Sequence, residues 1–241
     1  MGVYARVQIG SVQVIALNRL DGFSSGNFSQ LNVADYVGDD AENVTKNINK
    51  VQSLIGASDI AVMSAEHGNN VIKVSQGGKC LPSDALVTQV PNLALLALSA
   101  DCVTVALIDT QSELIAVVHS GWKGLVAQVL QTAIDSILAS GSQRKNLVAV
   151  IGPAICAECY EVSPDRVAKV SEINSAAILD SRHIDLCAGI KATLVDNAIR
   201  YEQIIGCTFE NEDLFSFRRA DGEPTGRGGM VVCLCTDEES S

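Results

Sequence analysis

A cysteine and a histidine stand at the two ends of a predicted β-hairpin. Apolar runs over residues 103–108 and 114–118 predict two strands, joined by a polar turn at 109–112. Cys102 directly precedes the first strand, and His119 directly follows the second. If the strands pair antiparallel, these two ends lie side by side. A thiol beside an imidazole can serve as half of a metal site or as a nucleophile–base pair.

A second histidine occupies a comparable position. His67 lies in a glycine-containing turn between predicted strands at 59–63 and 71–74, and the chain has only three histidines. With Cys102 and His119 it makes a set of three protein ligands, which is typical of catalytic zinc with an open fourth position. The alternative is structural, because a cysteine is often a small core side chain and a histidine at a strand end often bonds to the backbone.

The elements that must position these residues follow from hydrophobic periodicity. A helix is predicted from the Asp39-Asp40 cap to Gly56, a second between Gly124 and Gly141, and a third over 188–201. Further strands are predicted at 3–9, 12–17, 85–90, 93–98, 147–151, 204–208, 214–218 and 230–234. Strands outnumber helices and do not alternate with them, so we expect an α+β fold in a single domain over residues 1–235. The loop over 19–32 is long enough to suggest a functional role, and residues 236–241 predict an acidic, disordered tail.

Composition excludes several classes of partner. The chain has 241 residues, 47% of them hydrophobic, and a net charge of −11. That charge argues against a nucleic acid polymer as partner, although a local basic pocket for one phosphate is compatible with it. No apolar run approaches the ~18 residues that span a bilayer, and the N-terminus has neither a signal-peptide nor a myristoylation pattern. We therefore expect a soluble, cytoplasmic protein without membrane contact.

Eight cysteines are many for such a chain. Without a secretory signal they are expected to be reduced thiols. Cys156 and Cys159, with Cys233 and Cys235, suggest a zinc ribbon, but the second pair is too closely spaced and lies in a strand-like run. We therefore predict that the catalytic metal needs none of six cysteines, at 156, 159, 187, 207, 233 and 235.

A family resemblance rests on motifs that occur in order along nearly the whole chain. They are Arg19 with Gly22 and Ser24, Leu31-Asn32, Gly38-Asp39-Asp40, His67-Gly68, Ala100-Asp101-Cys102, His119-Ser120-Gly121-Trp122-Lys123-Gly124, Ile151-Gly152-Pro153-Ala154-Ile155, Tyr160-Glu161-Val162, Phe215-Ser216-Phe217-Arg218-Arg219 and Thr225-Gly226-Arg227. This order closely resembles the bacterial laccase-domain, or polyphenol-oxidase-like, family. Its members are also called peptidoglycan editing factors and purine nucleoside phosphorylases.

The resemblance implies an α+β layered sandwich of mixed β-sheets flanked by helices. It also implies a zinc site formed by His67, Cys102 and His119, with copper as the alternative metal. The chain departs from the family pattern at Ser120 and Lys123, where alanine and arginine are usual. A lysine is a point charge without the planar fork of arginine, so a bidentate contact there is in doubt.

Four functions are compatible with this pattern. The first is zinc-dependent phosphorolysis of purine nucleosides (adenosine or inosine), with deamination of adenosine as a related activity. Copper-dependent oxidation of phenols is the second, although three histidines are too few for a trinuclear copper centre. The third is a Cys/His or metal hydrolase that edits peptidoglycan precursors, with Cys102 as nucleophile, and the fourth is a non-catalytic nucleotide-binding module.

Phosphorolysis needs cations that hold phosphate, and arginine matches its geometry. The predicted phosphate-binding residues are Arg218 and Arg219, with Arg19, Lys123 and Arg227 as further candidates. Asn32 and Trp122 are expected to contact the base or the ribose. The expected partners are small molecules, either a purine nucleoside with phosphate or a phenol, and the expected assembly is a monomer or weak homodimer.

Overall fold

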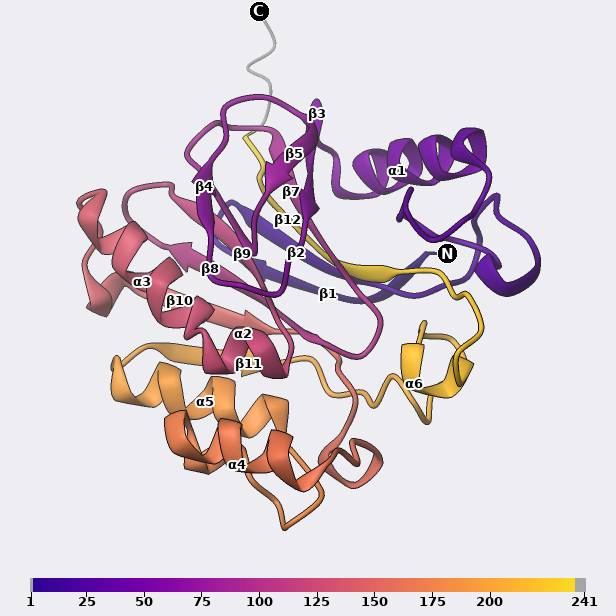
Figure 1. The fold of residues 1–241 in the computed structure, drawn as a ribbon. Coiled ribbons are helices and arrows are strands. Elements are labelled where there is room, and N and C mark those ends of the chain that lie inside the picture. The colour runs from indigo at the N-terminus through magenta and orange to yellow at the C-terminus, as the bar shows by residue number, and fades with distance from the viewer. Residues whose placement is uncertain (1, 237–241) are drawn as a thin grey trace, which may run out of the picture.

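Two six-stranded β-sheets pack face to face in the computed structural model, which describes residues 2–236 (Figure 1). The strands of one sheet, in spatial order, are β1 (Val3–Ile9), β2 (Val12–Leu17), β12 (Gly228–Leu234), β7 (Leu93–Ser99), β3 (Asp59–Ser64) and β5 (Gly78–Pro82). The strands of the other are β11 (Arg200–Gln203), β10 (Leu147–Ile151), β8 (Val103–Asp109), β9 (Ile115–Ser120), β6 (Ala85–Thr88) and β4 (Val71–Lys73). Both sheets contain parallel and antiparallel pairs, which confirms the predicted mixed sandwich.

Helices cover the two outer faces of the sandwich (Figure 1). They are α1 (Ala41–Ile55) on the first sheet and α2 (Trp122–Val126), α3 (Val129–Ala139), α4 (Pro164–Ile173) and α5 (Leu186–Asp196) on the side of the second, with a single-turn helix α6 (Phe217–Ala220). One apolar core lies between the sheets and another between the second sheet and its helices. The result is a single α+β domain, as predicted.

Helix α1 forms where its local signals place it. The carboxylate of Asp40 accepts a hydrogen bond from the backbone N–H of Asn43, and Gly56 ends the helix with a left-handed φ of 73°. Val44, Val51 and Ile55 are buried along one face. Capping and periodicity therefore agree, and the predicted helix is confirmed.

The central hairpin is confirmed as well. Strands β8 and β9 pair antiparallel, with Val103 opposite Ser120 and Thr104 opposite His119. Every residue of both strands is buried, because the hairpin lies between the two apolar cores. Its open end therefore presents Cys102 and His119 from a rigid support.

Three predicted elements differ from the structure. The helix predicted between Gly124 and Gly141 is interrupted by Gln128, which has a φ of 58°, and becomes α2 and α3. The helix predicted over 188–201 begins and ends earlier, because its last residues enter strand β11, parallel to β10. The predicted strand at 204–208 makes only one isolated bridge, at Cys207.

The predicted strand at 214–218 is also wrong. The Ser216 side chain accepts a hydrogen bond from the backbone N–H of Arg219 and so begins helix α6. Sequence reading also missed β5 and α4, although Pro164 at the first turn of α4 is a typical start signal. Short elements are decided by such caps more than by apolar periodicity.

The structure describes only the first residue of the predicted C-terminal tail. Thr236, the first residue of the predicted tail, receives and donates hydrogen bonds with the Asn92 side chain. Residues 237–241 lie outside the described residues. None of the helices between residues 2 and 236 is long and apolar enough to cross a membrane.

Candidate functional site

His67, Cys102 and His119 meet at one end of the sandwich. One ligand atom from each lies within 4.8 Å of the other two. The two imidazole rings stand nearly perpendicular, with centroids 4.9 Å apart. Cys102 and His119 come from the open end of the β8–β9 hairpin, and His67 comes from the turn by which β3 of one sheet leads to β4 of the other. The site therefore forms only when both sheets are in place.

Asp84, a residue that sequence reading missed, joins the two histidines. Its carboxylate accepts hydrogen bonds from the backbone N–H groups of His67, at 2.6 Å, and Gly68, at 2.9 Å. Its carbonyl oxygen accepts the N–H of His119 at 2.9 Å. The carboxylate also lies 4.0 Å from His119 Nδ1. The only sequence signal for Asp84 is its position as an acidic residue directly before a buried strand.

These hydrogen bonds to Asp84 hold the His67 turn in an uncommon backbone conformation. His67 has a φ of +63°, a region that is costly for residues other than glycine and that clusters at functional sites. Burial opposes ionisation of Asp84, but His119 and the N–H groups of Gly68 and His67 outweigh it and lower the pKa of the carboxyl. Asp84 is thus a buried carboxylate that fixes the backbone of the His67 turn and faces the imidazole of His119.

Cys102 and His119 shift each other's pKa in opposite directions. Burial alone would raise the pKa of the Cys102 thiol, but the charge and the imidazole donors of His119, together with His67, lower it to about 6. Burial alone would lower the pKa of His119, but the Cys102 thiolate and Asp84 raise it to about 9. The thiol is therefore poised as thiolate, the form that binds metal or acts as nucleophile.

The donor set fits a soft or borderline divalent cation. One thiolate and two imidazoles are ligands of zinc and copper. His119 Nδ1 is buried without a hydrogen-bond partner among the described residues, and a bound cation would stabilise an imidazole in such a place. His67, Cys102 and His119 are therefore the residues that would hold the metal.

A cavity of about 520 Å³ opens beside these three residues. Four cations line it, although the chain as a whole carries a net charge of −11: Lys123, Arg166, Arg218 and Arg227. Three of them stack on aromatic rings that also line the cavity, Arg166 on Trp122 at 4.6 Å, Arg218 on Tyr160 at 5.3 Å and Arg227 on Phe217 at 5.6 Å. The cavity thus offers both anion-binding groups and aromatic faces.

Arg218 is one of three cations on this wall with available donors. Its guanidinium makes no hydrogen bond to any residue in the described part of the chain, and the same holds for the charged groups of Arg166 and Lys123. In contrast, Arg227 Nη1 donates to two backbone carbonyls. The backbone N–H of Arg218 donates to Asp101 Oδ2 at 2.7 Å, so Arg218 is fixed beside Cys102. Asp101 itself has a φ of 99°, a second uncommon conformation at the site.

Three of the predicted site residues lie away from the cavity wall. The Arg219 guanidinium donates to the backbone carbonyls of Thr208, Phe209, Asn211 and Leu214, so it holds a loop together. Arg19 donates to the Ser29 carbonyl and stacks on Phe215. Asn32 is fully buried and bonds to Asp39 and to the backbone of Ala34 and Arg227.

Sequence reading also missed four wall residues. Tyr36 and Arg166 line the cavity, and so do Tyr160 and Phe217, which belonged to recognised motifs but were given no role. Arg166 lies on α4, which was not predicted. Burial raises the pKa of Tyr160 to about 12, so it remains a neutral phenol.

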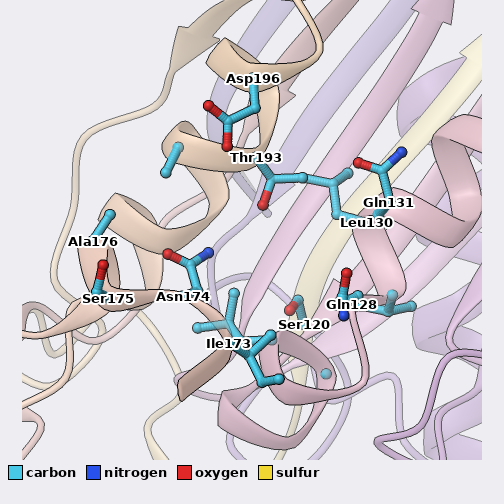
Figure 2. Close-up of a pocket in the computed structure, with 14 residues that line it drawn as sticks. Ser120, Gln128, Leu130, Gln131, Ile173, Asn174, Ser175, Ala176, Thr193 and Asp196 are labelled. Carbon is cyan, nitrogen blue, oxygen red and sulfur yellow. The ribbon is translucent and has the colours of Figure 1, made fainter. Parts of the chain in front are cut away.

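A second cavity, of about 410 Å³, lies between α3, α5 and the segment after α4 (Figure 2). Its wall includes Gln128, Gln131, Asn174, Thr193 and Asp196, and none of its described lining residues is a histidine, cysteine, arginine or lysine. It therefore offers neither soft metal ligands nor a cationic anion site. The cavity beside Cys102 is the better candidate for chemistry.

Substitution of Asp84 by asparagine is expected to weaken zinc binding by about 10- to 100-fold, because a neutral amide holds the His67 turn less firmly and no longer faces His119 with a negative charge. Competition with a chelator measures this affinity. Asp109→Asn is the matched control, since Asp109 is equally buried and accepts two turn N–H groups at the other end of β8. An equal loss of affinity in both variants would show that Asp84 acts only through stability.

Comparison with known proteins shows which chains this protein is similar to. Residues 13–235 match the family model described as multi-copper polyphenol oxidoreductase laccase. A purine nucleoside phosphorylase of Streptomyces coelicolor is 36% identical over 227 residues, covering 90% of this chain and 93% of the relative. An adenosine deaminase from an unknown prokaryotic organism is 27% identical and covers 80% of this chain and 82% of its own.

Solved structures share this fold over most of the chain. Neisseria meningitidis protein NMB0706 superposes with a TM-score of 0.86 and 28% identity, covering 98% of this chain and 100% of its own. The Bacillus licheniformis hypothetical protein YfiH gives a TM-score of 0.83 and 27% identity, with 92% of each chain covered. The chain belongs to the multi-copper polyphenol oxidoreductase laccase family.

Proposed function

We propose that this protein is a metal-dependent purine nucleoside phosphorylase that acts on adenosine or inosine, with adenosine deamination as a related activity. The observation that carries the proposal is that one cavity holds both the His67–Cys102–His119 set and the cation–aromatic wall. Relatives named purine nucleoside phosphorylase and adenosine deaminase support it.

The wall residues account for binding of both substrates. Purine bases stack on aromatic rings, and Trp122, Tyr160 and Phe217 present such faces. Phosphate is held by guanidinium groups, and Arg218 has its donors available, with Arg227 and Lys123 on the same wall. The two substrates can therefore meet in one cavity of sufficient size.

In phosphorolysis a phosphate oxygen attacks C1′ of the ribose, and the C1′–N9 bond breaks with its electron pair leaving on the base. The products are the free base, after protonation, and ribose 1-phosphate. The arginines hold and orient the attacking phosphate, which lowers the entropic part of the barrier. Zinc, if bound by His67, Cys102 and His119, would supply Lewis-acid polarisation at this wall.

Copper-dependent phenol oxidation is the second candidate, because a His₂Cys donor set is also found at copper sites. The third histidine, His183, is paired with Asp180 and is not in the metal-binding set. A trinuclear copper centre therefore lacks histidine ligands here. We expect oxidase activity only from copper that replaces zinc.

The test is product identity. Zinc-loaded protein is incubated with adenosine or inosine, with and without phosphate, and copper-loaded protein is assayed with a phenol. Free base and ribose 1-phosphate that depend on phosphate are the expected result. Phenol turnover at ordinary enzyme rates without release of base would overturn the proposal, as would base release that produces free ribose and ignores phosphate.

A metal-free sample assayed on a peptidoglycan precursor, and a measurement of nucleoside binding, separate the other two candidate functions. A peptidoglycan-editing hydrolase with Cys102 as nucleophile would be active without metal and would be inhibited by zinc, because a ligand thiolate cannot also attack a substrate. A non-catalytic binding module would bind nucleoside and release no product.

A further inference from the structure

A second cluster of thiols lies outside the cavity. Cys156, Cys159 and Cys207 have sulfur atoms that all lie within 4.8 Å of one another. Cys156 is the N-cap of a single 3₁₀ turn and Cys159 is its last residue. Cys207 comes from the segment after β11, which forms a bridge to Ala154. All three are reduced and partly exposed, so an ion could enter from solvent.

The geometry of the cluster suits a tetrahedral ion. With zinc–sulfur bonds of ~2.3 Å, the sulfurs of a tetrahedral site lie about 3.8 Å apart, which small side-chain rotations reach from the observed separation. The Glu210 Oε1 atom lies 3.8 Å from Cys159 Sγ, and rotation of this exposed side chain can bring its carboxylate to the fourth ligand position. The backbone N–H of Cys156 donates to Cys207 Sγ at 3.3 Å, which holds this sulfur beside the 3₁₀ turn that carries the other two.

The number of ligand atoms distinguishes a metal site from a disulfide, because three sulfurs and a carboxylate gather here. A disulfide would use only two of the sulfurs, and it would leave the third and the Glu210 carboxylate without a role.

We infer that Cys156, Cys159, Cys207 and Glu210 form a second metal site, which binds zinc or a similar soft divalent cation in a structural role. Such an ion would join the segments 154–160 and 207–214. The first carries Tyr160 of the cavity wall, and the second is tied to Asp101 because Thr208 Oγ1 donates to Asp101 Oδ1 at 2.6 Å. The ion would therefore fix the wall that Arg218 and Tyr160 share. This inference stands whether or not the protein is a phosphorylase.

The experiment measures zinc content in the full chain with the first site disabled. Cys102→Ala protein is purified under reducing conditions with added zinc, dialysed and analysed for metal. We expect one zinc per chain, reduced to near zero when Cys156→Ser and Cys159→Ser are added. Cys235→Ser, a partly buried cysteine outside the cluster, is the control and should retain the ion. Cobalt in place of zinc should give thiolate-to-metal charge-transfer absorption that the double substitution removes.

A substitution at one exposed residue tests the site independently, in case the cysteine variants misfold. Glu210→Gln in the Cys102→Ala background should fold normally and lower zinc affinity by about tenfold or more in chelator competition. No zinc above background in Cys102→Ala protein would overturn the inference. So would a mass two hydrogens lower under non-reducing conditions together with zinc-free protein, because that result identifies a disulfide instead.

Discussion

Cys102→Ala is expected to reduce phosphorolysis by about 10³-fold or more and to remove the metal held with His67 and His119. A Lewis-acid metal contributes several kcal/mol to transition-state stabilisation, and about 1.4 kcal/mol corresponds to a factor of ten in rate. Metal analysis and phosphate-dependent release of base are measured on the same samples. Zinc content should fall by the share that belongs to the first site.

The matched control is Cys80→Ala, a partly buried cysteine on β5, outside both candidate metal-binding sets. It should retain metal and activity. Deamination of adenosine should be lost together with phosphorolysis in Cys102→Ala protein, because both depend on the same site. Full activity in Cys102→Ala protein that contains no metal at His67 and His119 would contradict the assignment.

Arg218→Ala should raise the KM for phosphate by about 10- to 100-fold, with a much smaller change in the KM for nucleoside. Hydrogen bonds to a charged group contribute about 1.5–3 kcal/mol, and only one of the two substrates loses its counter-charge. Arg218→Lys should recover part of the loss, since a lysine restores charge without the bidentate geometry. The measurement is initial rates over a grid of both substrate concentrations.

Arg144→Ala controls for a general loss of positive charge and should change neither KM. Arg144 is exposed and lies outside the cavity wall. Equal increases in both KM values for Arg218→Ala would instead indicate a distorted wall. Arg219→Lys provides a contrast, because Arg219 donates to four backbone carbonyls. Arg219→Lys should lower the melting temperature and leave the KM for phosphate nearly unchanged.

The predictable part of this fold is locally encoded. The β8–β9 hairpin follows from two apolar runs around a polar turn, and α1 follows from its Asp40 cap and Gly56 end. In each case backbone propensity, capping and burial pattern agree. The side-by-side placement of Cys102 and His119 is a direct consequence of antiparallel pairing, so it too could be predicted.

Local pattern failed where a few contacts decide the conformation. The apolar residues around Phe215 suggested a strand, but the Ser216 cap and the contacts of Arg219 bend that segment into α6. Gln128 sits in a helix-compatible run, yet it adopts a left-handed conformation and separates α2 from α3. Neither outcome has a signal in composition or periodicity.

The sequence by itself determined the two sheets' main strands, the hairpin that presents Cys102 and His119, and the family. Only the tertiary structure decided that Arg218 faces the cavity while Arg219 holds a loop, that Asp84 clamps the His67 turn, and that Cys207 meets Cys156 and Cys159. Strands and helices with clear apolar periodicity and end signals are encoded by residues close together in the chain. Loop side chains meet across the molecule only through long-range packing, and residue type alone does not encode which loops will meet.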